Sequence, residues 1–274
     1  MGNEWMLLSF TCCSVLAAGC ISAAALGEVR GAAWRLTNGF ALGALLAVAA
    51  GCAAAVANLG QPQLVLGALG NPGSGIFWEL ISSASLLAGA AGYLLAGWRG
   101  AGYGTIRGLV LLSAAAAAAL LISIGLSFHM PWRPTLDTRT LFTAFLGWGL
   151  LEAFWCFRLL DALGDENARE LPRAFATVLP LGCLLVLAYP ASLLLFGSDE
   201  AAKALSESLG STHALLGWSG IVGLGMVLPA ALFFLRSHRA ATSVTAALLT
   251  LVSSAFFLDA VLQLGSAQWH FFNQ

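Results

Sequence analysis

The hydrophobic positions of the chain form long apolar runs, separated by short segments that contain charges, prolines or clustered glycines. Each run reaches about 18 residues or more, enough for a helix to cross a hydrocarbon core roughly 30 Å thick at a rise of about 1.5 Å per residue. The pattern therefore predicts an all-α bundle of eight transmembrane helices. We expect these helices at roughly 5–26, 37–57, 76–97, 105–127, 139–160, 172–196, 212–235 and 240–262.

Composition supports this prediction and makes the whole chain, 1–274, a single polytopic membrane domain. Its residues are 59% hydrophobic and 9% charged, with a mean hydropathy of +0.86, whereas about a quarter of the residues of a soluble domain are charged. The net charge of −1 gives no basic field for a nucleic acid. Because further apolar runs follow the first, we interpret that run as a helix, although the alanine-rich stretches near Ala17 and Ala23 would also suit a signal-peptide cleavage site.

The basic residues predict the orientation, because short loops that carry Lys and Arg stay in the cytoplasm. With the N-terminus and C-terminus both extracytoplasmic, nine basic residues fall inside and three outside. The inner ones are Arg30, Arg35, Arg99, Arg107, Arg158, Arg169, Arg173, Arg236 and Arg239, and the outer ones are Arg133, Arg139 and Lys203. The bias favours this topology and supports the even number of helices.

Cysteine and histidine positions argue against a metal or haem in this chain. The six cysteines all fall within expected helices and have no C-x-x-C spacing, which does not suit an iron–sulfur cluster or zinc. We expect them to be small packing residues. A membrane b-haem needs two histidines on facing helices at matched depth, and His129 with His213 is the only conceivable pair.

The segment between the second and third expected helices differs from the other loops. Residues 58–75 read NLGQPQLVLGALGNPGSG and contain no charge, two prolines and five glycines. A solvated loop of this length would ordinarily be polar. We expect this one to lie against the membrane surface or beneath a partner protein, which makes it a candidate for function.

Three carboxylic acids are expected at membrane depth, where ionisable groups are costly: Glu79, Glu152 and Asp259. Glu79 opens the third helix near the outer surface, where it either accepts a proton from a ligand or is favoured by the helix dipole. Glu152 lies deeper, and Asp259 lies near the outer end of the last helix. Both are possible proton-relay groups, or else acids that are hydrogen-bonded between helices.

Two stretches together resemble the membrane-anchor subunits of dimethyl sulfoxide reductase, the DmsC-like family. Residues Glu4 to Thr11 read EWMLLSFT, similar to that family's opening, and Asn58 to Glu79 resemble its loop between helices two and three. The matching positions in that loop are Asn58, Leu59, Gly60, Gln61, Pro62, Leu69, Asn71, Ser74 and Glu79. Chain length, eight helices and the expected topology also agree, while beyond helix three the similarity is only hydropathic.

The resemblance implies a specific function. Such anchors carry no haem, bind menaquinol near the outer face, and pass its electrons to a four-cluster ferredoxin-like iron–sulfur subunit that feeds a molybdopterin catalytic subunit. By motif position, the quinol site would involve Asn58, Gly60, Pro62, Ser74 and Glu79. Trp78, which adjoins Glu79, could form a wall of the same pocket.

The sequence also departs from the family pattern. Asn58 stands where the family has a histidine, and an amide cannot take up a proton. Gln63-Leu64 replaces the usual basic residue after the proline, and Leu258-Asp259-Ala260 stands where an arginine is expected. These changes suggest an altered pocket in which Glu79 or another group accepts the proton.

Two other functions remain open from the sequence. A small proton-coupled secondary transporter would use Glu152 and Asp259 as coupling groups, and it would favour an internal repeat or paired broken helices, neither of which is evident. A haem-bearing anchor would show a Soret band. The chain is not expected to carry out substrate chemistry by itself.

Overall fold

The structure is a computed structural model, and it describes residues 4–58, 67–164, 173–210, 217–234 and 240–267. Within these residues all regular structure is helical. Eight of the described helical segments are long and apolar enough to cross a membrane, which confirms the predicted all-α bundle of eight spans. These segments are Met6–Arg30, Trp34–Ala57, Gly75–Trp98, Tyr103–Ser127, Leu141–Leu163, Phe175–Leu195, Gly217–Phe234 and Ala240–Leu264.

The helices follow one another in a simple antiparallel order. They are α1 (Glu4–Arg30), α2 (Trp34–Asn58), α3 (Gly75–Trp98), α4 (Tyr103–Ser127), α5 (Leu141–Leu163), α6 (Val178–Leu195), α7 (Asp199–Gly210), α9 (Leu228–Phe234) and α10 (Ala240–Ala267). The short 3-10 helix η2 (Arg173–Thr177) leads into α6, and the π-helix η3 (Gly220–Val227) leads into α9. Tight connections such as the one at Gly31, with φ of 75°, keep neighbouring spans close together.

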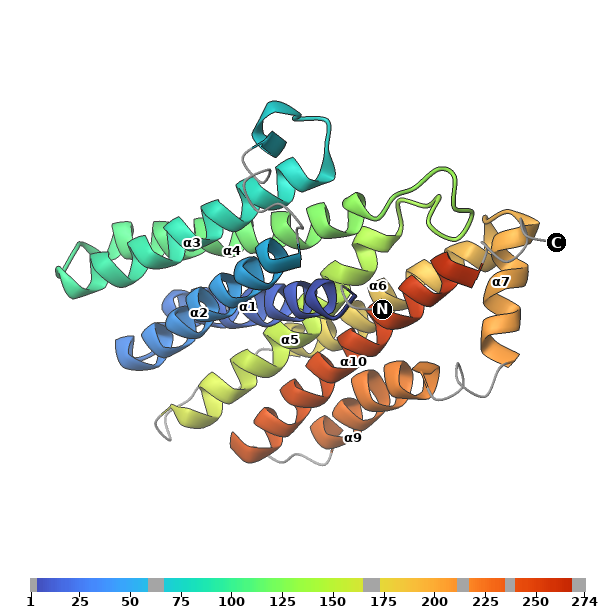
Figure 1. Cartoon of the computed structure of the whole chain (residues 1–274). Coiled ribbons are helices and arrows are strands. Elements are labelled where there is room, and N and C mark those ends of the chain that lie inside the picture. Colours follow the sequence, from blue (N-terminus) through green and yellow to red (C-terminus); the bar gives the residue numbers. More distant parts are fainter. Residues whose placement is uncertain (1–3, 59–66, 165–172, 211–216, 235–239, 268–274) are drawn as a thin grey trace.

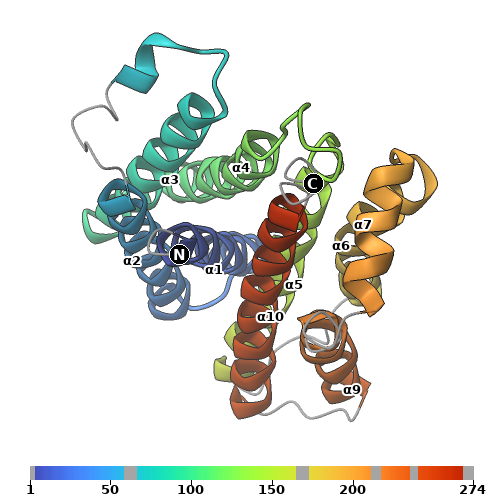
Figure 2. The same cartoon turned by 45° about the vertical axis from the view of Figure 1, so that its right-hand side comes forward.

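α1 and α5 form the centre of the bundle (Figure 2). α1 packs against α2, α4, α5 and α10, and α5 packs against α1, α4, α6 and α10. α2 and α3 lie on one side of this centre, and α6 and α9 on the other (Figure 1). α5 is the most buried span, so its polar side chains are the ones most strongly separated from lipid and water.

Glycine allows several of these helices to approach closely, as expected where lipid provides no hydrophobic drive for association. A Cβ atom on Gly19 of α1 would lie 2.5 Å from Cγ of Glu152 in α5. A Cβ on Gly147 of α5 would lie 2.7 Å from the backbone oxygen of Gly182 in α6. The central helices therefore touch backbone to backbone, and these positions have no room for a larger residue.

α7 is a helix that the hydrophobic pattern does not predict, because it is short and mostly polar. The hydroxyl of Ser198 caps it by accepting a hydrogen bond from the backbone N–H of Ala201 at 3.2 Å. Only Ala201 and Leu205, one turn apart, are buried on its inner face. Figure 1 shows α7 standing outside the bundle beside the end of α6.

The two ends of the bundle differ in charge among the described residues. Arg30, Arg35, Arg99, Arg107 and Arg158 lie in the end turns or connections at one end, and Arg133, Arg139 and Lys203 lie at the other. The asymmetry has the form that the positive-inside rule requires. The assignment of the first end to the cytoplasm stays a prediction.

Candidate functional site

Glu79 lies in the second turn of α3 and faces α4. The helix begins after Ser74, whose hydroxyl accepts a hydrogen bond from the backbone N–H of Ile76 at 3.3 Å. One turn further on, the carboxylate of Glu79 accepts a hydrogen bond from the hydroxyl of Ser127 at the end of α4. Gly75 makes this approach possible, because a Cβ atom there would lie 2.5 Å from Cβ of Ser127.

This partner changes the interpretation of Glu79. The first turn of α3 contains no acidic residue, and the field of a helix end weakens beyond that turn. The dipole therefore does not explain why a carboxyl group occupies this position. A hydroxyl on the neighbouring helix holds it instead, in a half-buried position at the end of the bundle.

The start of α3 and the residues before it expose apolar side chains. Trp78 is 53% exposed and Leu69 is 46% exposed, and the indole of Trp78 packs edge-on against Phe77, with ring centroids 5.2 Å apart. Large apolar side chains at the end of a membrane span contact the lipid interface or an apolar ligand. The first turns of α3 thus carry both a hydrogen-bonded carboxylate and an exposed aromatic ring, at neighbouring positions in the sequence.

The remaining residues of the predicted quinol site are not all described. Asn58 is the last residue of α2, and Gly60 and Pro62 lie outside the described residues. The structure brings together Ser74, Trp78 and Glu79, which all belong to the start of α3. Whether the loop after Asn58 joins them stays a prediction.

Asp259 is placed differently from the expectation of a hydrogen bond between helices. Its carboxylate accepts a hydrogen bond from Nε2 of Gln263, one turn further along α10, at 2.6 Å. Gln263 is exposed and Asp259 is half-buried. This hydrogen bond is therefore local to α10.

Glu152 is the central residue of α5 and is fully buried. Its Oε1 accepts a hydrogen bond from the thiol of Cys156 at 3.8 Å, and its Oε2 has no hydrogen-bond partner among the described residues. Arg158 does not approach it, since the guanidinium lies over the ring of Phe233 at 5.3 Å from the centroid. An acid at this depth is costly, which makes Glu152 a candidate for function.

A fourth acid at membrane depth escaped the sequence analysis. Glu28 of α1 is buried, and its Oε1 accepts hydrogen bonds from Thr37 of α2 at 2.8 Å and from Tyr93 of α3 at 2.7 Å. Tyr103 at the start of α4 donates to the backbone oxygen of Glu28 at 3.0 Å. The expected first helix ended at 26, before this residue, so the prediction of three acids was incomplete. The cluster joins the ends of four helices.

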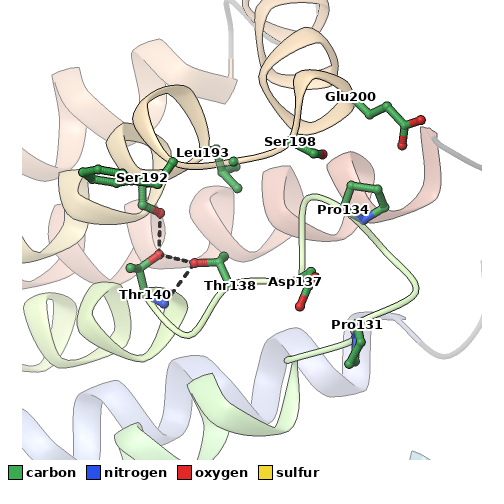
Figure 3. Close-up of a pocket in the computed structure, with 11 residues that line it drawn as sticks. Pro131, Pro134, Asp137, Thr138, Thr140, Ser192, Leu193, Ser198 and Glu200 are labelled. Atoms are coloured by element: carbon green, nitrogen blue, oxygen red, sulfur yellow. Dashed lines mark hydrogen bonds between the residues drawn. The ribbon is translucent and has the colours of Figure 1, made fainter.

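The structure contains a cavity of about 360 Å³ at the same end of the bundle as Glu79 (Figure 3). It lies between the loop that precedes α5, the end of α6 and the start of α7. The hydroxyls of Thr138, Thr140 and Ser192 form a chain along one wall, with oxygen separations of 2.8 and 2.5 Å, and Asp137 and Glu200 line the rim. No hydrophobic signal could have revealed this cavity, because polar loop residues and the unexpected helix α7 form it.

His129 is the one histidine in the part of the chain that the structure describes. No group of three or more His, Cys, Asp and Glu residues there could hold a metal ion. Nε2 of His129 lies 3.3 Å from Oδ1 of Asp137, and His213, its conceivable haem partner, is outside the described residues.

No protein-family model matches the chain, and no curated protein matches it. Its function must therefore be argued from the arrangement of its own residues, and from the motifs at Glu4 to Thr11 and Asn58 to Glu79.

Proposed function

We propose that this multi-pass membrane protein is the quinol-oxidising anchor of a respiratory oxidoreductase, and that Glu79 accepts a proton from the quinol. The observation that carries the proposal is the half-buried Glu79 carboxylate, held by Ser127 in the same helical turns as the exposed ring of Trp78. A quinol has an apolar ring with two hydroxyl groups. An aromatic wall and a carboxylate at the membrane surface suit both parts of such a ligand.

The chemical role that we propose for this chain in quinol oxidation is the acceptance of a proton. When a quinol loses two electrons and two protons, a carboxylate within hydrogen-bond reach can take a proton from a ring hydroxyl. Ser127 can hold Glu79 in place, since its hydroxyl donates to the carboxylate while the charge is present. Beyond Ser127, the next titratable side chain in sequence is His129, whose imidazole adjoins Asp137 at the cavity rim.

The resemblance supplies the rest of the proposal. The ligand is menaquinol, and two protons leave on the extracytoplasmic side of a bacterial cytoplasmic membrane. The electrons pass to a four-cluster ferredoxin-like iron–sulfur subunit and from there to a molybdopterin catalytic subunit. This chain contributes the quinol site and the membrane attachment.

The test is the Glu79→Gln variant, purified with whatever soluble subunits accompany the chain. We expect quinol-dependent turnover to fall by about a hundredfold, the lower range for the loss of a positioned proton acceptor. Assembly should persist, because the amide keeps the size of the side chain. Turnover is measured with a short-chain menaquinol analogue and an artificial electron acceptor.

Glu207→Gln is the matched control, since it makes the same chemical change in α7, where Glu207 is exposed and lies 3.8 Å from Lys203. It should leave turnover unchanged. If Glu79→Gln oxidises quinol as fast as this control, Glu79 is not the proton acceptor. If the chain purifies alone and oxidises no quinol, the proposal as a whole fails.

A second candidate function is favoured by Glu152. Glu152 is a fully buried carboxyl group at the centre of a central span, and one of its oxygens has no partner among the described residues. This is also the arrangement expected of a coupling group in a proton-coupled transporter. The π-helix η3 in the seventh span adds an interrupted helix of the kind that transporters use. For a transporter, Glu152→Gln would abolish proton-coupled solute uptake into vesicles while Glu79→Gln would not.

A further inference from the structure

Two thiols meet in the centre of the bundle. Cys20 of α1 and Cys156 of α5 are 136 residues apart in the chain, and their Sγ atoms lie 4.0 Å apart. Both are free thiols. A disulfide bond is about 2.0 Å long and requires Cα atoms within roughly 7 Å of each other. The two sulfurs thus need to move together by about 2 Å, a distance that side-chain rotation and a slight helix shift can supply.

The backbones around these thiols are already in contact. Gly19, the residue before Cys20, packs against Glu152, one turn before Cys156, and a Cβ atom on Gly19 would lie 3.0 Å from the backbone carbonyl carbon of Glu152. α1 and α5 therefore cross closely at this point, because Gly19 contributes no side chain to the contact. Such a crossing is the geometry in which two cysteines on different helices can be bridged.

A proton acceptor adjoins the pair. The thiol of Cys156 donates a hydrogen bond to Oε1 of Glu152 at 3.8 Å, and Oε2 of Glu152 has no partner among the described residues. The thiolate rather than the thiol is the reactive form of cysteine. A carboxylate at this distance can take the proton from Cys156.

The position of the pair limits its reaction partners. Glu152 is the central residue of a 23-residue span, so the thiols lie well inside the hydrocarbon region, where water-soluble oxidants do not enter. Cys156 is buried, but Cys20 is only partly covered by the protein. A lipid-soluble, apolar oxidant can therefore reach Cys20 from within the bilayer.

We propose that Cys20 and Cys156 form a reversible disulfide between α1 and α5, with a quinone dissolved in the bilayer as the oxidant and Glu152 as the proton acceptor. Both S–H bonds break and one S–S bond forms. The two electrons and two protons pass to the quinone, one proton by way of Glu152, and one quinol is released. The reaction does not rest on the site at Glu79, which lies at the end of the bundle on α3 and α4.

Cys12 makes a different contact. Its Sγ lies 4.0 Å from the hydroxyl of Ser254 in α10. Cys12 is thus a matched control, because it belongs to the same helix as Cys20 and its hydrogen-bond partner is a hydroxyl. Cys12→Ala should leave the reaction of Cys20 with Cys156 intact.

The test uses the full-length protein in lipid nanodiscs, reduced and then freed of reductant in the absence of oxygen. A ubiquinone analogue with a fully substituted ring is added, because a free ring position would let a thiol add permanently. Remaining thiols are alkylated and the peptides are identified by mass spectrometry. We expect a Cys20–Cys156 cross-linked peptide and one quinol per disulfide, in the unmodified protein and in Cys12→Ala alike.

Cys20→Ala and Cys156→Ala should give neither the cross-link nor quinol, and Glu152→Gln should slow the reaction by about a hundredfold without changing its final yield. If either alanine variant fails to fold, the cross-linked peptide and quinol yield of the unmodified protein decide the question. If all six thiols of that protein remain open to alkylation after quinone treatment, or if other cysteine pairs form instead, the proposal is wrong. An unchanged rate in Glu152→Gln would overturn the role of the carboxylate.

Discussion

Glu79 and Glu152 are the same residue type in two opposite surroundings. Glu79 sits at the end of the bundle, half-buried, with a hydroxyl partner on the neighbouring helix and an exposed tryptophan beside it. Glu152 sits at the centre of α5, fully buried, with one weak thiol donor and, among the described residues, no partner for its second oxygen. The first carboxyl group lies at an end of the bundle, whereas the second lies among side chains inside it.

The difference shows that access, rather than the presence of an acid, decides which reaction a carboxyl group can serve. At the start of α3, the ring of Trp78 is exposed at the end of the bundle. At the crossing of α1 and α5, close backbone contact leaves room only for side chains already present, and two of these are thiols. The quinol site that we propose belongs to the first of these surroundings, and the redox-active thiol pair that we propose belongs to the second.

The largest expected effect on stability comes from adding a methyl group at the crossing of α1 and α5. Gly19→Ala places a methyl group against Glu152, where the backbone leaves it no room. Overpacking of this kind costs about 1–3 kcal/mol. The variant should lower the thermal denaturation midpoint of the protein in detergent, measured by the loss of the monodisperse peak after heating.

Gly39→Ala in α2 makes the same change at an open position, because no heavy atom lies within 4 Å of its added methyl group. It should change stability by less than about 0.5 kcal/mol. If Gly19→Ala and Gly39→Ala are equally stable, the crossing of α1 and α5 is not packed as described. The contrast between the two carboxyl groups then loses its basis.

A smaller effect is expected at the start of α3. Ser127→Ala removes the hydroxyl that donates to Glu79, and a hydrogen bond of this kind contributes about 0.5–1.5 kcal/mol. Quinol-dependent turnover should then fall by up to about tenfold, while thermal stability stays close to that of the unmodified protein. A variant that turns over normally would show that Ser127 does not position Glu79.

The number of spans could be predicted because each spanning helix corresponds to a long apolar run in the sequence. Span ends were harder to predict, and α1 shows why. It continues to Arg30 because Thr37 and Tyr93 satisfy Glu28 through contacts from other helices. The hydrophobic pattern did not predict α7, because the buried face of this helix consists of only Ala201 and Leu205.

The candidate site residues could likewise be predicted from the sequence only in part. Glu79 and Glu152 stood out because charge is rare in these spans, and both lie where the hydropathy placed them. Their partners, Ser127 and Cys156, could not be found from the sequence, because a serine or cysteine in an apolar helix carries no signal of what it faces. The pairing of Cys20 with Cys156 depends on a helix crossing that only a three-dimensional structure provides.

The most direct test of the central claim is infrared difference spectroscopy of the protein as its bound quinone is cycled electrochemically between quinone and quinol. Cys20→Ala serves as the background, so that the thiol pair contributes nothing. We predict a carboxyl C=O band that changes with quinone oxidation state, is lost in Glu79→Gln and persists in Glu152→Gln. A band that survives in Glu79→Gln, or one that disappears only in Glu152→Gln, would contradict the assignment of the quinol site to the start of α3.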